Sequence, residues 1–269
     1  MRKAVVVLLS VLALVLGLSS YADAAKAPYK VSLATSVAKS SAGRFITVSG
    51  HVTGPKAAGH SVTIQRHFVG GPWVTVASAT ISSRGNYRAR VETPRGGTTS
   101  FRAIKGRSSV RSAGVSPTRS LPVYEWLYLA NVNAIATQGV LQNTSVTIAG
   151  KTYARSITMN GTSPGMEVKL GGLCTTLTST LQYQSTNGSI VPASMNFAFA
   201  VYPAGGGPAT PTTGQLDTSF VVPLTIPLTG GNVLQMLTSN MDSDYQYALG
   251  DPKVYCNADH LPSWTSSDL

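Results

Sequence analysis

The densest group of side chains that could do chemistry lies near the C-terminal end of the chain, at Asp242, Asp244, Tyr245 and Tyr247. In an extended segment the two tyrosines point to the same side. An aromatic ring can stack on the apolar face of a sugar ring, and carboxylates can pair with its hydroxyl groups. The pattern therefore predicts a ligand-binding surface at these four residues.

Trp126 and Tyr128 have the same two-residue spacing and form a second candidate ligand-binding platform. Aromatic residues of strand proteins also commonly fill the core or its rim, and that alternative stands for both groups. Asp242 and Asp244 offer the oxygen ligands that calcium prefers, without the glycine and distal glutamate of an EF-hand loop. We expect no cofactor, with a structural calcium ion at these aspartates as the alternative.

Residues that catalysis commonly uses are few. The four histidines are scattered, at positions 51, 60, 67 and 260, and the chain has no Gly-x-Ser-x-Gly, His-Glu-x-x-His or glycine-rich phosphate loop. A glycosidase needs two carboxylates across a cleft, so Glu125 or Glu167 would have to meet Asp242 and Asp244 through the fold. The sequence predicts a protein that is not an enzyme, with a glycoside hydrolase as an alternative.

Short strands are expected to position these side chains. The 269 residues are 43% hydrophobic and 12% charged, with 26 glycines and 15 prolines, so the chain can build a core but shows no helical periodicity. Segments of alternating polarity recur at roughly ten-residue spacing between turn residues. This predicts an all-β fold of two sandwiches, the second a jelly roll.

The two halves of the chain carry opposite charge. Residues 25–120 contain 15 basic residues and one acidic residue, Glu92, whereas residues 121–269 contain four basic and eight acidic residues. Clustered cations on a sheet attract polyanions, and an exported protein meets anionic cell-envelope polymers rather than nucleic acid. The predicted polyanion-binding residues, expected to project from one side, are Arg88, Arg90, Arg102, Lys105 and Arg107; a merely solvated basic surface is the alternative.

The first 24 residues have the layout of a secretory signal peptide. A basic start is followed by an apolar run from Ala4 to Leu18 and by the small-residue pattern Ala22-Asp23-Ala24. No other segment is long and apolar enough to span a membrane, so a secreted or cell-surface protein is expected. In that setting the two cysteines, Cys174 and Cys256, predict one disulfide bond.

The first half resembles the bacterial immunoglobulin-like modules of exported proteins. The matching pieces are the strand Val48-Ser-Gly-His-Val, the strand beginning Val62-Thr-Ile, the strand Trp73-Val-Thr-Val and the Gly85-Asn-Tyr turn. The resemblance covers about residues 31–120 and implies an immunoglobulin-like sandwich. The small residues and prolines of 112–122 predict the end of this domain at residue 120.

The second half resembles the NPCBM family of carbohydrate-binding modules. Four pieces carry the likeness: Trp126-Leu-Tyr-Leu-Ala-Asn-Val, Gly150-Lys-Thr-Tyr-Ala-Arg, Val168-Lys-Leu-Gly-Gly-Leu-Cys, and Met195-Asn-Phe-Ala-Phe-Ala-Val-Tyr with the closing segment 242–255. The resemblance implies a galactose-binding-like jelly roll that holds a polysaccharide or glycan. The chain departs from the family pattern at Thr158-Met-Asn160 and at Ala248–Asp251, where sugar contacts of relatives would be altered.

Together these features predict a signal peptide at 1–24, a basic immunoglobulin-like domain at 25–120, an NPCBM-like domain at 121–258 and a tail at 259–269. The expected function is non-catalytic binding of carbohydrate at the cell envelope. A structural or protein-interaction scaffold is the alternative from another class, in which both sandwiches bind a protein partner instead of a glycan.

Overall fold

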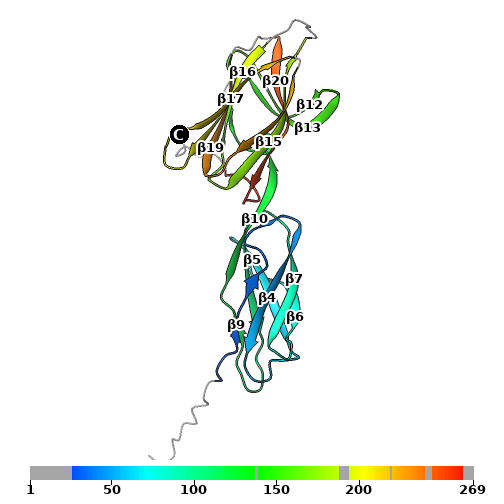
Figure 1. Ribbon diagram of the computed structural model, residues 1–269, viewed down its shortest axis with the longest axis vertical. Coiled ribbons are helices and arrows are strands. Elements are labelled where there is room, and N and C mark those ends of the chain that lie inside the picture. Colours follow the sequence, from blue (N-terminus) through cyan, green and yellow to red (C-terminus); the bar gives the residue numbers. More distant parts are fainter. Residues whose placement is uncertain (1–25, 137–138, 188–193, 219, 240–243, 263–269) are drawn as a thin grey trace, which may run out of the picture.

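The computed structural model describes residues 26–136, 139–187, 194–218, 220–239 and 244–262. Strands dominate these residues, which contain one short 3-10 helix, η1 (Leu129–Asn131). Figure 1 shows two β-bodies that follow one another along the chain, the first in blue to green and the second in green to red. The predicted all-β class is confirmed.

The first body is a sandwich of two layers. Its packed core includes the fully buried side chains Val48, Ile64, Phe101 and Val123, which alternate with outward-facing residues along their strands. One layer contains β1 (Lys30–Val31), β2 (Ala34–Thr35), β4 (Arg44–Thr53) and β7 (Asn86–Thr93). The other contains β3 (Ser40–Ser41), β5 (Ser61–Phe68), β6 (Val74–Thr80), β8 (Gly97–Lys105), β9 (Gly114–Val115) and part of β10 (Arg119–Tyr128). These strands pair antiparallel except β3, which pairs parallel with β10.

The second body is also a sandwich, consistent with the predicted jelly roll. Its larger core includes Leu177, Tyr183, Phe199 and Leu234. One layer contains β12 (Val140–Ile148), β13 (Lys151–Asn160), β15 (Cys174–Ser185), β18 (Val221–Pro227) and β20 (Tyr245–Cys256). The other contains β11 (Ile135–Ala136), β14 (Gly165–Lys169), β16 (Ser194–Pro203), β17 (Thr210–Asp217) and β19 (Gly231–Ser239).

Strand β10 belongs to both bodies. Residues 119–123 pair with β8 of the first sandwich, and residues 125–128 pair with β20 of the second (Figure 1). Leu121 is buried in the first core, and Leu129, which follows the strand, is buried in the second. Residues 114–122 therefore lie in and between strands β9 and β10, and Ser112 forms a β-bridge with Pro28, so the segment is not an open linker. The boundary at residue 120 stays a prediction.

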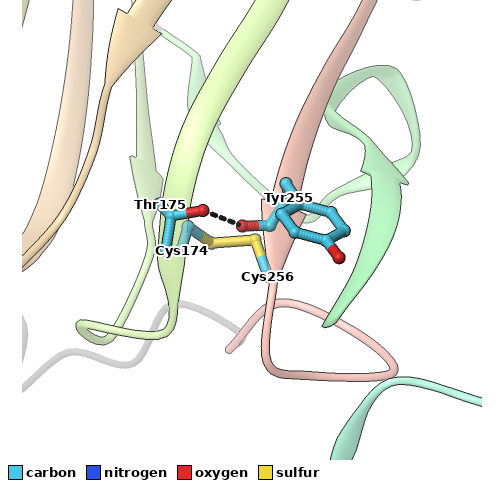
Figure 2. Close-up of a disulfide and its surroundings, with 4 residues drawn as sticks. All are labelled: Cys174, Thr175, Tyr255 and Cys256. Carbon is cyan, nitrogen blue, oxygen red and sulfur yellow. Dashed lines mark hydrogen bonds between the residues drawn. A yellow bond between two sulfur atoms is a disulfide. The ribbon is translucent and has the colours of Figure 1, made fainter. Parts of the chain in front are cut away.

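The predicted disulfide between Cys174 and Cys256 is confirmed. The two cysteines are direct cross-strand partners on β15 and β20, with their Cα atoms 3.9 Å apart. Figure 2 shows the disulfide on one side of β20 and the ring of Tyr255 directed away from it. The covalent link thus holds the end of β20 in place on the core side, and the neighbouring residue presents its ring outward.

Some predictions concern residues outside the described ranges. The signal peptide at 1–24 and residues 263–269 of the predicted tail are among them, and both stay predictions. The described part of the tail enters the structure, because Leu261 packs in the second core. Among the described residues, no helix has the length and apolar character needed to cross a bilayer.

Candidate functional site

The predicted platform at Tyr245 and Tyr247 is wrong. The two side chains are 3% and 1% exposed and belong to the second core, where Tyr245 packs against Tyr183 and Tyr247 stacks on Phe197. The two side chains do lie on the same side of β20, as predicted, but that side of the strand faces the core. Asp242 lies outside the described residues, so its role and the proposed calcium ligation stay predictions.

The other predicted pair, Trp126 and Tyr128, faces outward. Both lie on the side of β10 opposite Leu121 and Val123, and Tyr124 shares their face. The Trp126 side chain is 45% exposed. The chain therefore places three aromatic residues in a row along one strand, on the surface of the sheet.

Strand β20 adds a fourth aromatic residue to this row. Tyr255 is the direct cross-strand partner of Trp126, and their ring centroids lie 5.0 Å apart. On its other side Tyr255 stacks on Tyr124 at 5.2 Å. We call Tyr124, Trp126 and Tyr255 the junction cluster, because it lies where β10 passes from the first sandwich to the second.

The position of the junction cluster is fixed by hydrogen bonds across the two bodies. The Tyr255 hydroxyl bonds the Ser41 hydroxyl of β3, in the first sandwich. The backbone amide of Gly96 donates to Glu125 Oε2 at 2.8 Å, on the strand that carries the cluster. The hydrogen bond of Tyr255 reduces the number of rotamers that its ring can adopt, and this preorganisation lowers the entropic cost of ligand binding.

Three hollows surround the junction cluster. The largest, of about 460 Å³, lies between Arg44 and Glu125 against the Trp126 ring. The second, of about 410 Å³, combines Trp126 and Tyr128 with the polar side chains Asn131, Asn133, Asp259 and His260. The third, of about 240 Å³, adds Lys39, Ser40 and Thr175 beside Tyr124 and Tyr255. The exposed Trp126 ring and the half-buried Tyr124 and Tyr255 rings, flanked by hydrogen-bonding groups, form an arrangement that can hold a sugar chain.

Tyr128 differs from the junction cluster in what covers it. The guanidinium carbon of Arg155 lies 4.4 Å from its ring centroid, and Lys253 Nζ lies 4.5 Å from it. Lys253 is its direct cross-strand partner. Cations this close engage the π-face by electrostatic attraction. Arg155 and Lys253 therefore form a basic patch over the Tyr128 ring, next to the junction cluster. A sugar could stack on Tyr128, as predicted, only if these cations moved.

A salt bridge supports the wall of the second hollow. Arg95 Nη1 of the first body lies 3.1 Å from Asp259 Oδ2 of the second, and both side chains are partly exposed. A partly exposed ion pair contributes little to stability by itself. Its effect here is positional, because Asp259 lines the hollow beside Trp126.

The predicted basic residues do not form one face. Arg88 and Arg90 point outward from β7, whereas Arg102 points outward from β8 in the opposite layer. Lys105 is 5% exposed; it lies over the Tyr29 ring and donates to the Gly106 carbonyl. The expectation of one basic side is therefore wrong, since the strands belong to different layers, and Lys105 is not available to a polymer.

Two of the carboxylates considered for a glycosidase lie on different sheets. Glu125, on β10, accepts the Gly96 amide, and Glu167, on β14, accepts a 2.6 Å hydrogen bond from Gln235 Nε2. The predicted partners of these glutamates were Asp242 and Asp244, and because Asp242 lies outside the described residues that pairing stays a prediction. Within the described ranges no group of three or more His, Cys, Asp or Glu could hold a metal ion.

Sequence reasoning missed two members of the site. Tyr124 had a usable signal, because Tyr124, Trp126 and Tyr128 alternate along one segment and must share a face if it is a strand. Tyr255 had no such signal, since its place beside Trp126 depends on the pairing of β10 with β20, which are more than 100 residues apart in sequence.

Comparison with solved structures gives many likenesses, of which two are described here. One is to a structure described as the "structural basis for the promiscuous specificity of the carbohydrate-binding modules from the beta-sandwich super family", with 11% identity over 87% of this chain and 94% of that one, at a TM-score of 0.26. The other is to the N-terminal CBM22-1–CBM22-2 tandem domain of Paenibacillus barcinonensis Xyn10C, with 9% identity over 85% and 93%, at a TM-score of 0.31.

Because both TM-scores are below 0.5, neither likeness carries an inference about this chain. Neither a protein-family model nor a curated protein sequence matches it. The resemblances to NPCBM and immunoglobulin-like modules stay predictions.

Proposed function

We propose that this protein is an exported, non-catalytic carbohydrate-binding protein that holds a polysaccharide chain against the junction cluster. The observation that carries the proposal is the row formed by Tyr124, Tyr255 and the exposed Trp126, with polar side chains in hollows on its flanks. Stacking on these rings would supply affinity, and Asn131, Asn133 and Asp259 would pair with sugar hydroxyls.

Co-sedimentation with insoluble polysaccharides tests this proposal. We expect the protein to be retained on at least one of cellulose, chitin, xylan and peptidoglycan sacculi, and Trp126→Ala to weaken retention about tenfold or more, since a central aromatic anchor is removed. Phe220→Ala is the matched control, because Phe220 is 58% exposed and lines none of the three hollows beside the cluster. The absence of retention on all four materials would refute the proposal.

A second candidate function is retention on anionic cell-envelope polymers by the first sandwich. It is favoured by the 15 basic residues and one acidic residue of 25–120, and Arg88 and Arg107 are exposed. Such binding weakens steeply with salt because it releases counterions. Retention on sacculi that survives 0.5 M salt undiminished would argue against it.

The scaffold alternative makes a different prediction. If the two sandwiches bind a protein partner, retention on cell envelopes disappears after protease treatment of the envelope and survives glycan digestion. Carbohydrate binding predicts the reverse.

A further inference from the structure

A separate hollow of about 620 Å³ lies in the first sandwich, on the outward face of the layer formed by β1, β2, β4 and β7. It does not touch the junction cluster. Its polar lining includes Ser36, Thr47, Ser49, His51, Asn86 and Arg88, and Ser32, Gly50 of β4 and Tyr87 of β7 complete it.

The acceptor atoms of this lining are used within the protein. Ser32 Oγ accepts the His51 amide at 2.9 Å, and Ser36 Oγ accepts the Thr47 amide at 3.1 Å. Asn86 Oδ1 lies 3.1 Å from His51 Nδ1 and accepts from it when that nitrogen is protonated. The Ser32 hydroxyl also donates to the His51 carbonyl at 3.5 Å, whereas the Ser36 hydroxyl keeps its own hydrogen to donate and Asn86 keeps its NH₂ group. The hollow therefore presents donors.

Arg88 adds a positive charge to these donors. Its guanidinium donates one hydrogen bond to Thr47 Oγ1 at 3.5 Å. A guanidinium has five N–H groups, so others can donate to a ligand. None of the lining residues carries a carboxylate. Glu92, the acidic residue of 25–120, lies on β7 four residues after Arg88. Its charge acts on Arg66: burial lowers the pKa of the Arg66 guanidinium, and the negative charge of Glu92 opposes that shift.

The backbone beneath the hollow is held in one arrangement. The Tyr87 hydroxyl donates to the Ser32 carbonyl, which brings the N-terminal segment onto β4. A Cβ atom at position 50 would lie 2.0 Å from the Ser32 oxygen and 2.5 Å from Tyr87 Oη, so glycine is required there. The donors are thus positioned before a ligand arrives, which reduces the cost of binding.

From this arrangement we infer that the hollow is a binding site for an oxyanion group, a phosphodiester or a carboxylate, of an anionic polymer. Several fixed donors and one guanidinium match the acceptor oxygens of such a group. The inference rests on the second candidate function and deepens it, because it replaces a diffuse basic surface with one site on one layer.

Titration calorimetry at fixed ionic strength tests the site, with poly(glycerol phosphate) as the phosphodiester probe and polygalacturonate as the carboxylate probe. Arg88→Gln is expected to weaken binding about fivefold or more. Arg90→Gln is the matched control: it removes the same charge from the same face of β7, but Arg90 packs over Phe45 and does not line the hollow, so a change below about twofold is expected.

Asn86→Asp provides a second, nearly isosteric variant. It keeps an oxygen for His51 and converts the donor NH₂ group into a charged acceptor, so it should abolish binding to whichever probe the protein binds. Circular dichroism should show all three variants folded, since the three side chains are exposed.

Equal losses for Arg88→Gln and Arg90→Gln would overturn the site and leave diffuse anionic retention standing. Failure of the unmodified protein to bind either probe would overturn the site and the second candidate function together, without bearing on the junction cluster. Selective loss with Arg88→Gln and Asn86→Asp would support the site, and the probe affected would identify the group.

Discussion

Two buried tyrosine hydroxyls differ in whether they have a hydrogen-bond partner. The Tyr87 hydroxyl donates to the Ser32 carbonyl, whereas the buried Tyr247 hydroxyl has no hydrogen-bond partner among the described residues. A buried polar group without a partner keeps its desolvation cost, and a paired one recovers most of it. The same chemical change should therefore have opposite effects at the two positions.

We predict that Tyr247→Phe leaves the free energy of unfolding unchanged or raises it by about 1 kcal/mol, and that Tyr87→Phe lowers it by about 1 kcal/mol. Urea denaturation followed by circular dichroism measures both. A loss of more than about 1 kcal/mol with Tyr247→Phe would show that its hydroxyl does have a partner.

The same tyrosines predict the response to alkaline pH. Burial raises the pKa of Tyr87 to about 12 and raises the pKa of Tyr247 well above its usual value of 10. The unfolded chain loses these protons near pH 10 while the folded chain keeps them, so their stabilising contribution is complete below pH 10 and declines as pH rises through 12.

Replacing either tyrosine should consequently flatten the decline of unfolding free energy between pH 10 and 12. The slope should fall by up to about 1.4 kcal/mol per pH unit for each tyrosine removed. Denaturation curves of Tyr247→Phe and the unmodified protein at pH 9, 10.5 and 11.5 provide the comparison, and parallel slopes would contradict the assignment.

At the scale of elements, the alternation of polar and apolar residues predicted where strands lie, but it did not predict which side of a strand faces the core. The two-residue spacing of Tyr245 and Tyr247 correctly gave a common side, and so did that of Trp126 and Tyr128. The first pair is buried and the second is on the surface. Which side of a strand faces the core depends on its pairing register with distant strands, and local sequence does not encode that register.

The charge composition likewise did not predict on which layer each basic residue lies. The basic composition of 25–120 was evident from the sequence, but the division of Arg88 and Arg102 between opposite layers follows from strand order. The disulfide could be predicted, because a chain with two cysteines has a single possible pairing within itself.

The disulfide should stabilise the second sandwich. Cys174 and Cys256 are 82 residues apart in sequence, so their link removes a large loop-closure entropy from the unfolded chain. We predict that the Cys174→Ser, Cys256→Ser double variant has a free energy of unfolding about 2–4 kcal/mol lower. Guanidinium denaturation under non-reducing conditions measures it, and an unchanged midpoint would contradict the prediction.

At the scale of the whole molecule, the junction joins the two sandwiches without a linker. Strand β10 pairs in both, and Gly96 lies so close to the second body that an added Cβ would be 2.1 Å from the Ala258 carbonyl oxygen. The wall of the hollow beside Trp126 includes Asp259, which Arg95 of the first sandwich contacts. The proposed carbohydrate site therefore depends on contacts between both bodies.

We predict that Gly96→Ala separates the bodies at this contact and weakens polysaccharide retention several-fold. Distances between spin labels on the two sandwiches should become more widely distributed in the variant. Gly106→Ala is the control, because a Cβ atom there meets nothing within 4 Å. Identical distance distributions for Gly96→Ala and the unmodified protein would contradict the role given to this contact.

The most direct test of the account is a fluorescence titration that reports on Trp126. The chain has three tryptophans, so Trp126→Phe and Trp73→Phe can be compared with the unmodified protein. On addition of cellohexaose, chitohexaose, xylohexaose or laminarihexaose, we expect at least one hexasaccharide to shift the emission of the unmodified protein and of Trp73→Phe, and the shift to disappear in Trp126→Phe. A shift that persists in Trp126→Phe, or no shift with any of the four, would contradict carbohydrate binding at the junction cluster.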